Sequence, residues 1–270
     1  GSRMSGTLTR DQLEHFTTFG FVVARAAFSP AETEQLQRAA EAACREVLER
    51  EPQPDDVVWE PGQVEARDDL RWLMEDDRIF GPVTELMGGT FIWFGSELMR
   101  GVDRNGGPVH HWHTDGETDP AKLPFRRLKV MIYLDSLRKD SGALRLIPGS
   151  HRSPLYDQLL PFHQVHTSAE PRFFGIAGPE LWCYPVETDP GDVVFVNPWT
   201  FHAVYGDSGT RRNLVLKFSE RPASDAALLQ LRDLPQRFFV PHQGLVASDG
   251  PRIRQMAADL VECGRAAARL

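Results

Sequence analysis

The chain has 270 residues, of which 41% are hydrophobic and 25% are charged. These values are typical of a globular protein with a sizeable core, built as one large domain or two small ones. The net charge of −8 argues against a general nucleic-acid or membrane-surface binder, because both usually need a basic face. No apolar run approaches the length of a membrane span, and no secretory signal opens the sequence.

The cysteines Cys44, Cys183 and Cys263 are odd in number, far apart and without metal-ligand spacing. This usage is typical of structural thiols in a reducing compartment, so we expect a cytoplasmic protein. Residues 1–3 precede Met4 and are typical of a tag remnant, so they are left out of the fold prediction. We expect a monomer or a homodimer.

The first third of the chain is predicted to be mainly helical. Thr9 is suited to cap a helix that ends near residue 19. Ser29, Pro30 and Glu32 supply the N-cap, the first-turn proline and the capping box of a second helix, which continues to about residue 50. A loop rich in proline and acidic residues follows over residues 51–69, and then a weaker helical stretch.

From residue 90 the pattern changes to short strands separated by Gly/Pro turns, with no helices between them. Such a series favours a β-sandwich or barrel over a parallel α/β sheet. A long connection over residues 152–185 is typical of a lid or a substrate loop. We therefore predict one domain over residues 1–270, mainly β with flanking helices. Its parts are an N-terminal helical part (8–90), a β core (91–220) and C-terminal helices (221–270).

His113 and Asp115 form a His-x-Asp pair just before a strong strand. Residues two apart in a strand point to the same side, so the imidazole and the carboxylate face one point. His202 follows another strong strand and offers a second imidazole. Two histidines and one carboxylate on one face of a metal leave three positions open, which suits non-haem Fe(II) oxygen chemistry. The pair alone would be weak, since such pairs often arise by chance.

An arginine soon after His202 fits this chemistry, because a guanidinium can bind the far carboxylate of a dicarboxylic co-substrate with two parallel hydrogen bonds. Strand alternation puts Arg212 on one face with Leu214, Leu216 and Phe218, and Arg211 on the other face with Asn213, Val215, Lys217 and Ser219. The second face is polar and typical of a solvated surface. We therefore expect Arg212 to point inward, with Arg211 as the alternative.

With these residues the chain resembles the phytanoyl-CoA dioxygenase family of Fe(II)/2-oxoglutarate-dependent oxygenases. The resemblance covers roughly residues 8–220. The segments that carry it are Phe19-Gly20-Phe21-Val22-Val23, Ser29-Pro30-Ala31-Glu32, Trp112-His113-Thr114-Asp115, the stretch from Ser141 to His151, Pro190-Gly191-Asp192, and His202 with Arg212.

The resemblance implies a double-stranded β-helix, or cupin-like jelly roll, with helices packed outside. It implies Fe(II) bound by His113, Asp115 and His202, with 2-oxoglutarate held by Arg212 and O₂ as the second co-substrate. Ascorbate is the expected reductant in vitro. Halogenating relatives lack the carboxylate at position 115, so its presence indicates hydroxylation rather than halogenation.

Two positions depart from the family pattern and concern the co-substrate pocket. Val204 stands where many members have a serine, and Met131 stands where many have a tryptophan. Lys129 and Tyr133 share the face of Met131, so we expect them to take over part of this pocket.

Four further residues are candidates for substrate contact, each with an alternative. His111, like His110, fits the substrate entrance or a third ligand position, and Trp199 fits the core or the pocket wall. Arg100 fits an acidic substrate or a surface salt bridge. His163, with His151 and His166 near it, fits a substrate contact or a solvated loop.

The favoured function is hydroxylation of a small organic molecule in secondary or amino-acid metabolism. Desaturation, cyclisation, epimerisation and epoxidation use the same site and remain alternatives. A cupin-like protein that binds a metal such as Zn²⁺ through His113 and His202 without turnover is the alternative of another class. An inward arginine argues against it, because a plain metal-binding module has no need of a buried guanidinium.

Overall fold

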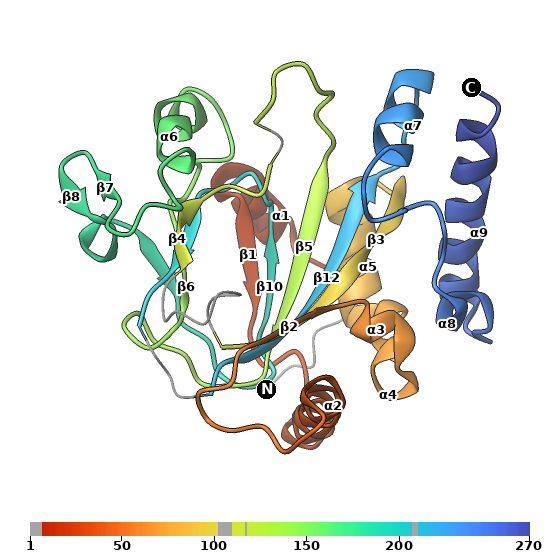
Figure 1. The fold of residues 1–270 in the computed structure, drawn as a ribbon, viewed down its shortest axis with the longest axis horizontal. Helices are drawn as coiled ribbons and strands as arrows, with labels where there is room; N and C mark the ends of the chain where they lie inside the picture. The colour runs from red at the N-terminus through yellow and green to blue at the C-terminus, as the bar shows by residue number, and fades with distance from the viewer. Residues whose placement is uncertain (1–6, 102–109, 117, 207–209) are drawn as a thin grey trace.

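Two antiparallel sheets that face each other form the centre of the molecule (Figure 1). The computed structural model describes residues 7–101, 110–116, 118–206 and 210–270, so residues 1–3 lie outside it. The larger sheet has six strands in the order β1-β10-β5-β12-β3-β2, and the smaller has four in the order β4-β11-β6-β9. Over the described residues the sheets do not close into a barrel. The predicted jelly-roll architecture with flanking helices is confirmed.

The elements follow one another without an internal repeat. The strands are β1 (Phe21–Ala24), β2 (Val58–Pro61), β3 (Phe91–Arg100), β4 (His110–His113), β5 (Arg127–Tyr133), β6 (Leu144–Leu146), β7 (Arg172–Phe173), β8 (Ile176–Ala177), β9 (Tyr184–Val186), β10 (Val193–Val196), β11 (His202–Val204) and β12 (Arg212–Glu220). The helices are α1 (Arg10–Phe19), α2 (Pro30–Leu48), α3 (Gln63–Ala66), α4 (Asp68–Arg71), α5 (Asp77–Met87), α6 (Leu155–His163), α7 (Asp225–Arg232), α8 (Gln243–Val246) and α9 (Pro251–Ala267). None of the helices in the described part of the chain is both long and apolar enough to cross a bilayer.

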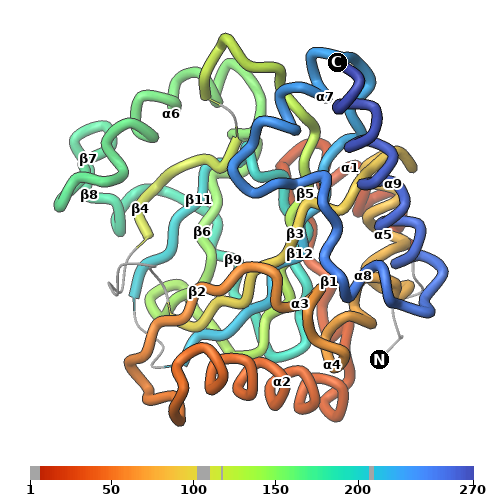
Figure 2. The backbone as a smooth tube through the Cα atoms, turned by 45° about the vertical axis from the view of Figure 1, so that its right-hand side comes forward, coloured from red at the N-terminus to blue at the C-terminus, as the bar shows by residue number. Residues whose placement is uncertain are grey.

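The six-stranded sheet is covered on both faces. On one face Val130, Ile132 and Leu216 belong to the main hydrophobic core, which also takes in apolar residues of α2, α5 and α9. On the other face the alternate residues Met131 and Val215 point toward the four-stranded sheet. In Figures 1 and 2, α6 and the β7–β8 hairpin lie beside β4, away from the C-terminal helices. The space between the sheets is therefore the place for a site.

Two regions predicted as loops carry regular structure. Residues 51–69 contain β2 and the short helices α3 and α4, and β2 pairs with β3 as an edge strand. The connection over residues 152–185 contains α6 and the β7–β8 hairpin. These elements are only two to nine residues long, so the periodicity of their sequence does not reveal them.

The predicted N-cap at Thr9 and the predicted capping box at Ser29 are present, and Thr9 also forms a capping box with Gln12. At the Ser29 capping box, Arg78 joins the start of α2 to the start of α5. Its guanidinium donates to both carboxylate oxygens of Glu32 at 3.0 Å and to Asp76, the N-cap of α5, at 2.8 Å. The hydrogen bonds from Arg78 and from the Ser29 N–H lower the pKa of Glu32 to about 2.

We expect Glu32→Gln to lower the Tm at neutral pH, and to lower it progressively less as the pH falls. The pKa of Glu32 falls from 4.5 to about 2 on folding, so its contribution is complete above pH 4.5 and is lost as the pH falls toward 2. The interaction is partly exposed and contributes about 1 kcal/mol, or roughly 2–4 °C in Tm. Thermal unfolding at pH 7, 5 and 3 measures the difference. Glu34→Gln, which removes a solvent-exposed pair at 3.8 Å, is the control and should show no such trend.

Candidate active site

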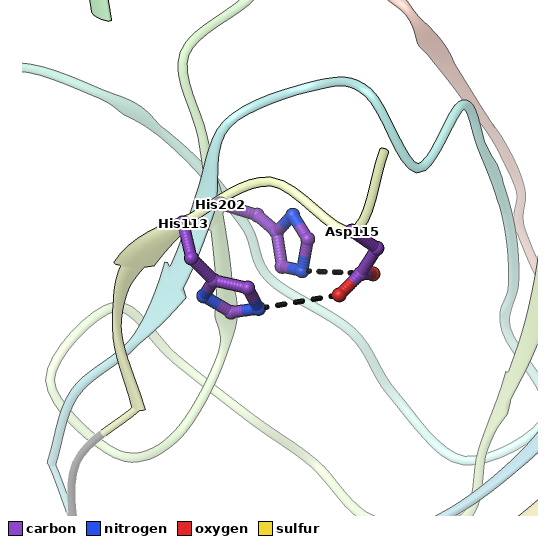
Figure 3. Close-up of side chains that lie close together, drawn as sticks. All are labelled: His113, Asp115 and His202. Atoms are coloured by element: carbon purple, nitrogen blue, oxygen red, sulfur yellow. Dashed lines mark ion pairs between the residues drawn. The ribbon is translucent and has the colours of Figure 1, made fainter. Parts of the chain in front are cut away.

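His113, Asp115 and His202 converge between the two sheets (Figure 3). His113 ends β4 and is paired directly with His202, which begins β11. Asp115 lies beyond the end of β4, where its backbone N–H donates to the Pro198 carbonyl at 2.9 Å. An irregular segment, rather than the predicted continuation of the strand, therefore brings the carboxylate to the two rings.

The three side chains have the spacing of a metal site. Nε2 of His113 lies 3.4 Å from Oδ1 of Asp115, and Nε2 of His202 lies 3.4 Å from Oδ2. The candidate ligand atoms all lie within 4.8 Å of one another. Two imidazoles and one carboxylate arranged in this way suit Fe(II) and leave the remaining positions open.

Backbone carbonyls set the tautomer of both rings. Nδ1 of His113 lies 2.7 Å from the His111 carbonyl, and Nδ1 of His202 lies 2.8 Å from the Thr200 carbonyl. A carbonyl only accepts, so each Nδ1 carries the proton and each Nε2 presents a lone pair toward Asp115. Burial and the neighbouring His202 lower the pKa of His113 to about 4, which keeps this ring neutral at physiological pH. The donor set therefore fits a divalent metal.

Lys129 of β5 holds the carboxylate from the other side. Its Nζ lies 2.5 Å from Oδ2 of Asp115. Burial alone would raise the pKa of Asp115, but Lys129, His202 and His113 outweigh it and hold that pKa well below its usual range. Lys129 itself is partly buried beside Asp115 and Glu97, and the two carboxylates raise its pKa against the effect of burial. One carboxylate oxygen is thus occupied by the ammonium group, and Oδ1 faces His113.

We expect Lys129→Met to reduce Fe(II) affinity or turnover by roughly 10- to 100-fold, the usual cost of removing a group that orients a metal ligand. Without the ammonium group the Asp115 carboxylate is free to rotate. Anaerobic Fe(II) titration and 2-oxoglutarate turnover are the two measurements. Lys129→Arg keeps the charge and should recover part of the loss, whereas wild-type values for Lys129→Met would show that Asp115 needs no such support.

A cavity of about 400 Å³ extends from this centre between the sheets. Its lining comprises Trp59, Glu97, Met99, His110, His113, Thr114, Asp115, Lys129, Met131, Leu144, His163, His166, His202, Val204, Arg211 and Val215.

Arg211 lines this cavity and Arg212 does not, so the predicted orientation of the two arginines is wrong. Arg211 is 2% exposed, and its Nε and Nη1 donate to the Gly142 carbonyl at 2.7 Å and to Oδ1 of Asn213 at 2.9 Å. Arg212 points to the helical side, where it forms ion pairs with Asp135 at 2.7 Å and Glu41 at 2.9 Å. The polar face of β12 is thus the cavity face, and the apolar face packs on helices.

The other residues expected in the co-substrate pocket lie at or just behind its wall. Lys129, Met131 and Val204 line the cavity. Tyr133 is fully buried behind Met131, with its hydroxyl 3.7 Å from the Met131 sulfur. Its ring also lies 5.7 Å from the guanidinium of Arg211. Tyr133 therefore supports two residues of the pocket without lining it.

His110, rather than His111, contacts the centre. Between β4 and β11 the pairing shifts from His202–His113 to Val204–His110, so β4 carries one extra residue. This bulge turns His110 inward, where its ring stacks on His113 at 4.2 Å. His111 does not line the cavity, and its Nδ1 lies 3.2 Å from the Tyr205 hydroxyl.

Of the remaining substrate candidates, only His163 lines the cavity, together with His166. Arg100 is buried at the end of β3 and donates to the Asp56 carbonyl at 3.2 Å. It does not line the cavity, and it has no ion pair among the residues that the structure describes. Trp199 packs near Tyr156 at 5.9 Å, outside the cavity lining. Glu97 and Trp59 also line the cavity, and no motif in the sequence marks either residue.

A family model described as phytanoyl-CoA dioxygenase (PhyH) matches residues 16–213 of the chain. No curated protein matches it closely enough to count as a relative.

Solved structures share the fold at low sequence identity. HygX from Streptomyces hygroscopicus, solved with nickel and 2-oxoglutarate, has a TM-score of 0.62 and 18% identity over 79% of this chain and 88% of its own. The α-ketoglutarate-dependent carbocyclase SnoK from nogalamycin biosynthesis has a TM-score of 0.60 and 19% identity over 82% and 88%. EctD from S. alaskensis, solved with 2-oxoglutarate and 5-hydroxyectoine, has a TM-score of 0.58 and 20% identity over 82% and 79%. At this identity the likeness concerns the fold.

Proposed function

Since the chain belongs to the phytanoyl-CoA dioxygenase family of Fe(II)/2-oxoglutarate-dependent oxygenases, we propose that it hydroxylates an unactivated C–H bond of a small organic molecule. The observation that carries the proposal is that one cavity is lined both by the His113–Asp115–His202 triad and by the buried Arg211. A plain metal-binding protein has no need of that guanidinium.

His113, Asp115 and His202 hold the iron in this proposal. Bound Fe(II) supplies the centre at which 2-oxoglutarate and O₂ react. The protein contributes three ligands on one face of the metal, with both rings fixed by backbone carbonyls. Asp115 occupies a position that halogenating enzymes leave to chloride, which supports hydroxylation over halogenation.

Arg211 binds the far carboxylate of 2-oxoglutarate. It has no carboxylate within ion-pair distance among the residues that the structure describes, and burial lowers its pKa. A buried guanidinium without a counter-ion is costly, so an anionic ligand in the cavity would stabilise it. The apolar side chains of Met131, Leu144 and Val215 line the same cavity and suit the methylene groups of the co-substrate.

The pocket offers the co-substrate fewer hydrogen bonds than the usual family pattern. Met131 and Val204 are apolar and offer no hydrogen bond at positions where many relatives have one. Tyr133 supports Met131 and Arg211 from behind, and Lys129 acts through Asp115. Recognition of the far carboxylate therefore depends heavily on Arg211.

The test has an anaerobic step and an aerobic step. 2-Oxoglutarate added to the Fe(II) protein without O₂ should produce the visible charge-transfer band of a chelated keto acid. With O₂ and ascorbate, succinate should form, and the substrate should gain one oxygen atom. Loss of two hydrogens would instead indicate desaturation or cyclisation, and unchanged mass would indicate epimerisation. Absence of both the band and succinate would leave only the metal-binding alternative.

A further inference from the structure

Two histidines that are not among the candidate metal ligands lie beside the triad. His163 ends α6, and His166 follows it three residues later; their ring centroids are 4.8 Å apart. The His166 ring lies 5.9 Å from that of the ligand His113. Both rings line the cavity, but neither belongs to the group of candidate metal ligands found among the described residues. They face the space in which a substrate must approach the metal.

Hydrogen bonds fix opposite tautomers in this pair. The backbone N–H of Thr114 donates to Nδ1 of His163 at 3.3 Å, so the proton of the neutral ring sits on Nε2. Nδ1 of His166 instead donates to the His163 carbonyl, so Nε2 is the ring nitrogen that is left to accept. The pair thus offers one donor and one acceptor side by side.

The charged side chains around the cavity are already matched. Glu97 is ionised, because Lys217 and Lys129 lower its pKa against the effect of burial, and it pairs with Lys217 at 2.9 Å. Asp115 pairs with Lys129 at 2.5 Å. In the proposed function, Arg211 binds the far carboxylate of 2-oxoglutarate. Among the described lining residues no charge is therefore left for a charged group of the substrate.

We propose that His163 and His166 form a hydroxyl-binding subsite, and that the substrate is a neutral, hydroxyl-rich small molecule. A hydroxyl group both donates and accepts, so it satisfies Nε2–H of His163 and the bare Nε2 of His166 at once. Trp59 and Met99 line the cavity from the side of β2 and β3 and offer apolar surface to the carbon skeleton. This assignment rests on the proposed function, because it names the substrate class of the same site.

The experiment first records the anaerobic Fe(II)–2-oxoglutarate band without any probe, which tests the proposed function alone. Substrate-stimulated formation of succinate is then measured with five probes. Methyl α-D-glucopyranoside and myo-inositol are neutral polyols, D-glucosamine is a cation, D-glucuronate is an anion, and tetrahydropyran-2-methanol is a ring with a single hydroxyl. We expect at least one neutral polyol to stimulate succinate formation several-fold more than the other three probes. With the band present, stimulation by the charged or hydroxyl-poor probes alone, or by none, would overturn the subsite.

Variants of the two histidines test the hydrogen-bond pattern. His163→Leu and His166→Leu should each lose stimulation by the neutral polyol by about tenfold or more, measured as the ratio of succinate formed with and without the polyol by the same variant. His163→Gln keeps a donor and His166→Gln keeps an acceptor, so each should recover part of the response. His242→Leu, at an exposed histidine outside the cavity, is the matched control. Full stimulation in both leucine variants would refute the proposal, and a preserved Tm and band exclude misfolding as the cause of a loss.

Discussion

Arg211→Met is expected to weaken 2-oxoglutarate binding by roughly 30-fold or more, because losing one partner of a buried, hydrogen-bonded charge pair costs about 2–5 kcal/mol. The guanidinium is 2% exposed and is held in place by Gly142 and Asn213, so its loss leaves the co-substrate carboxylate without a counter-ion. Arg211→Lys keeps the charge but not the planar fork, and should fall between the variant and the wild type. Titration of the Fe(II) protein under anaerobic conditions, followed by the charge-transfer band, gives the dissociation constants.

Arg212→Met is the matched control, one residue away and on the opposite face of β12. Arg212 bridges Asp135 and Glu41, which belong to the helical side of the sheet. Its loss should lower the Tm while 2-oxoglutarate binding stays within about twofold of wild type, as expected for a site that the substitution does not touch. Normal binding by Arg211→Met together with lost binding by Arg212→Met would reverse our assignment of the two arginines.

The sequence did not reveal which of Arg211 and Arg212 faces the cavity. Alternation along β12 was predicted correctly, since Leu214 and Leu216 share one face and Asn213 and Val215 share the other. The error lay in taking the polar face as solvated. This sheet has two covered faces, and the polar one lines a cavity whose chemistry requires polar groups. Strand alternation predicts which residues share a face. It does not predict which face lines the cavity and which face packs on the helices.

The triad could be predicted because its chemistry demands particular residue types in a fixed order along the chain. The residues around it could not, for local reasons. The bulge in β4 exchanges the roles of His110 and His111, and a one-residue shift of this kind has no signature in the sequence. Trp59 reaches the cavity from an edge strand of four residues, too short to be predicted. His163 and His166 depend on how α6 packs against β4.

Asp115→Ala is expected to reduce Fe(II) affinity by more than about 100-fold and to abolish turnover of 2-oxoglutarate. Substitution of residues that only orient a ligand already costs roughly 10- to 100-fold, so loss of a ligand itself should cost more. Titration with Fe(II), and with Ni(II) as an air-stable substitute, measures the affinity. Asp115→Asn, which keeps the shape and removes the charge, should also bind weakly. Near-normal affinity in both variants would mean that the carboxylate is not a ligand.

Asp115→Ala should also destabilise the metal-free protein, because Asp115 is the counter-ion of Lys129 as well as a candidate metal ligand. Without the carboxylate, Lys129 keeps only the more distant Glu97 as a counter-ion, because Asp115 is its 2.5 Å partner. An unpaired ammonium that is largely buried costs about 3 kcal/mol, so the free energy of unfolding of Asp115→Ala should fall by roughly that amount. Denaturant unfolding with a chelator present measures it.

The double variant Asp115→Ala/Lys129→Met removes the orphaned charge along with its partner. It should recover most of the lost stability but none of the Fe(II) affinity, because an apolar pair replaces the ion pair while the metal still lacks a ligand. Recovery of both properties would mean that Asp115→Ala impairs metal binding only by disturbing the fold. Recovery of neither would mean that Lys129 is not the group that Asp115 neutralises. Recovery of stability without recovery of Fe(II) affinity would show that Asp115 is a metal ligand and that Lys129 only positions its carboxylate.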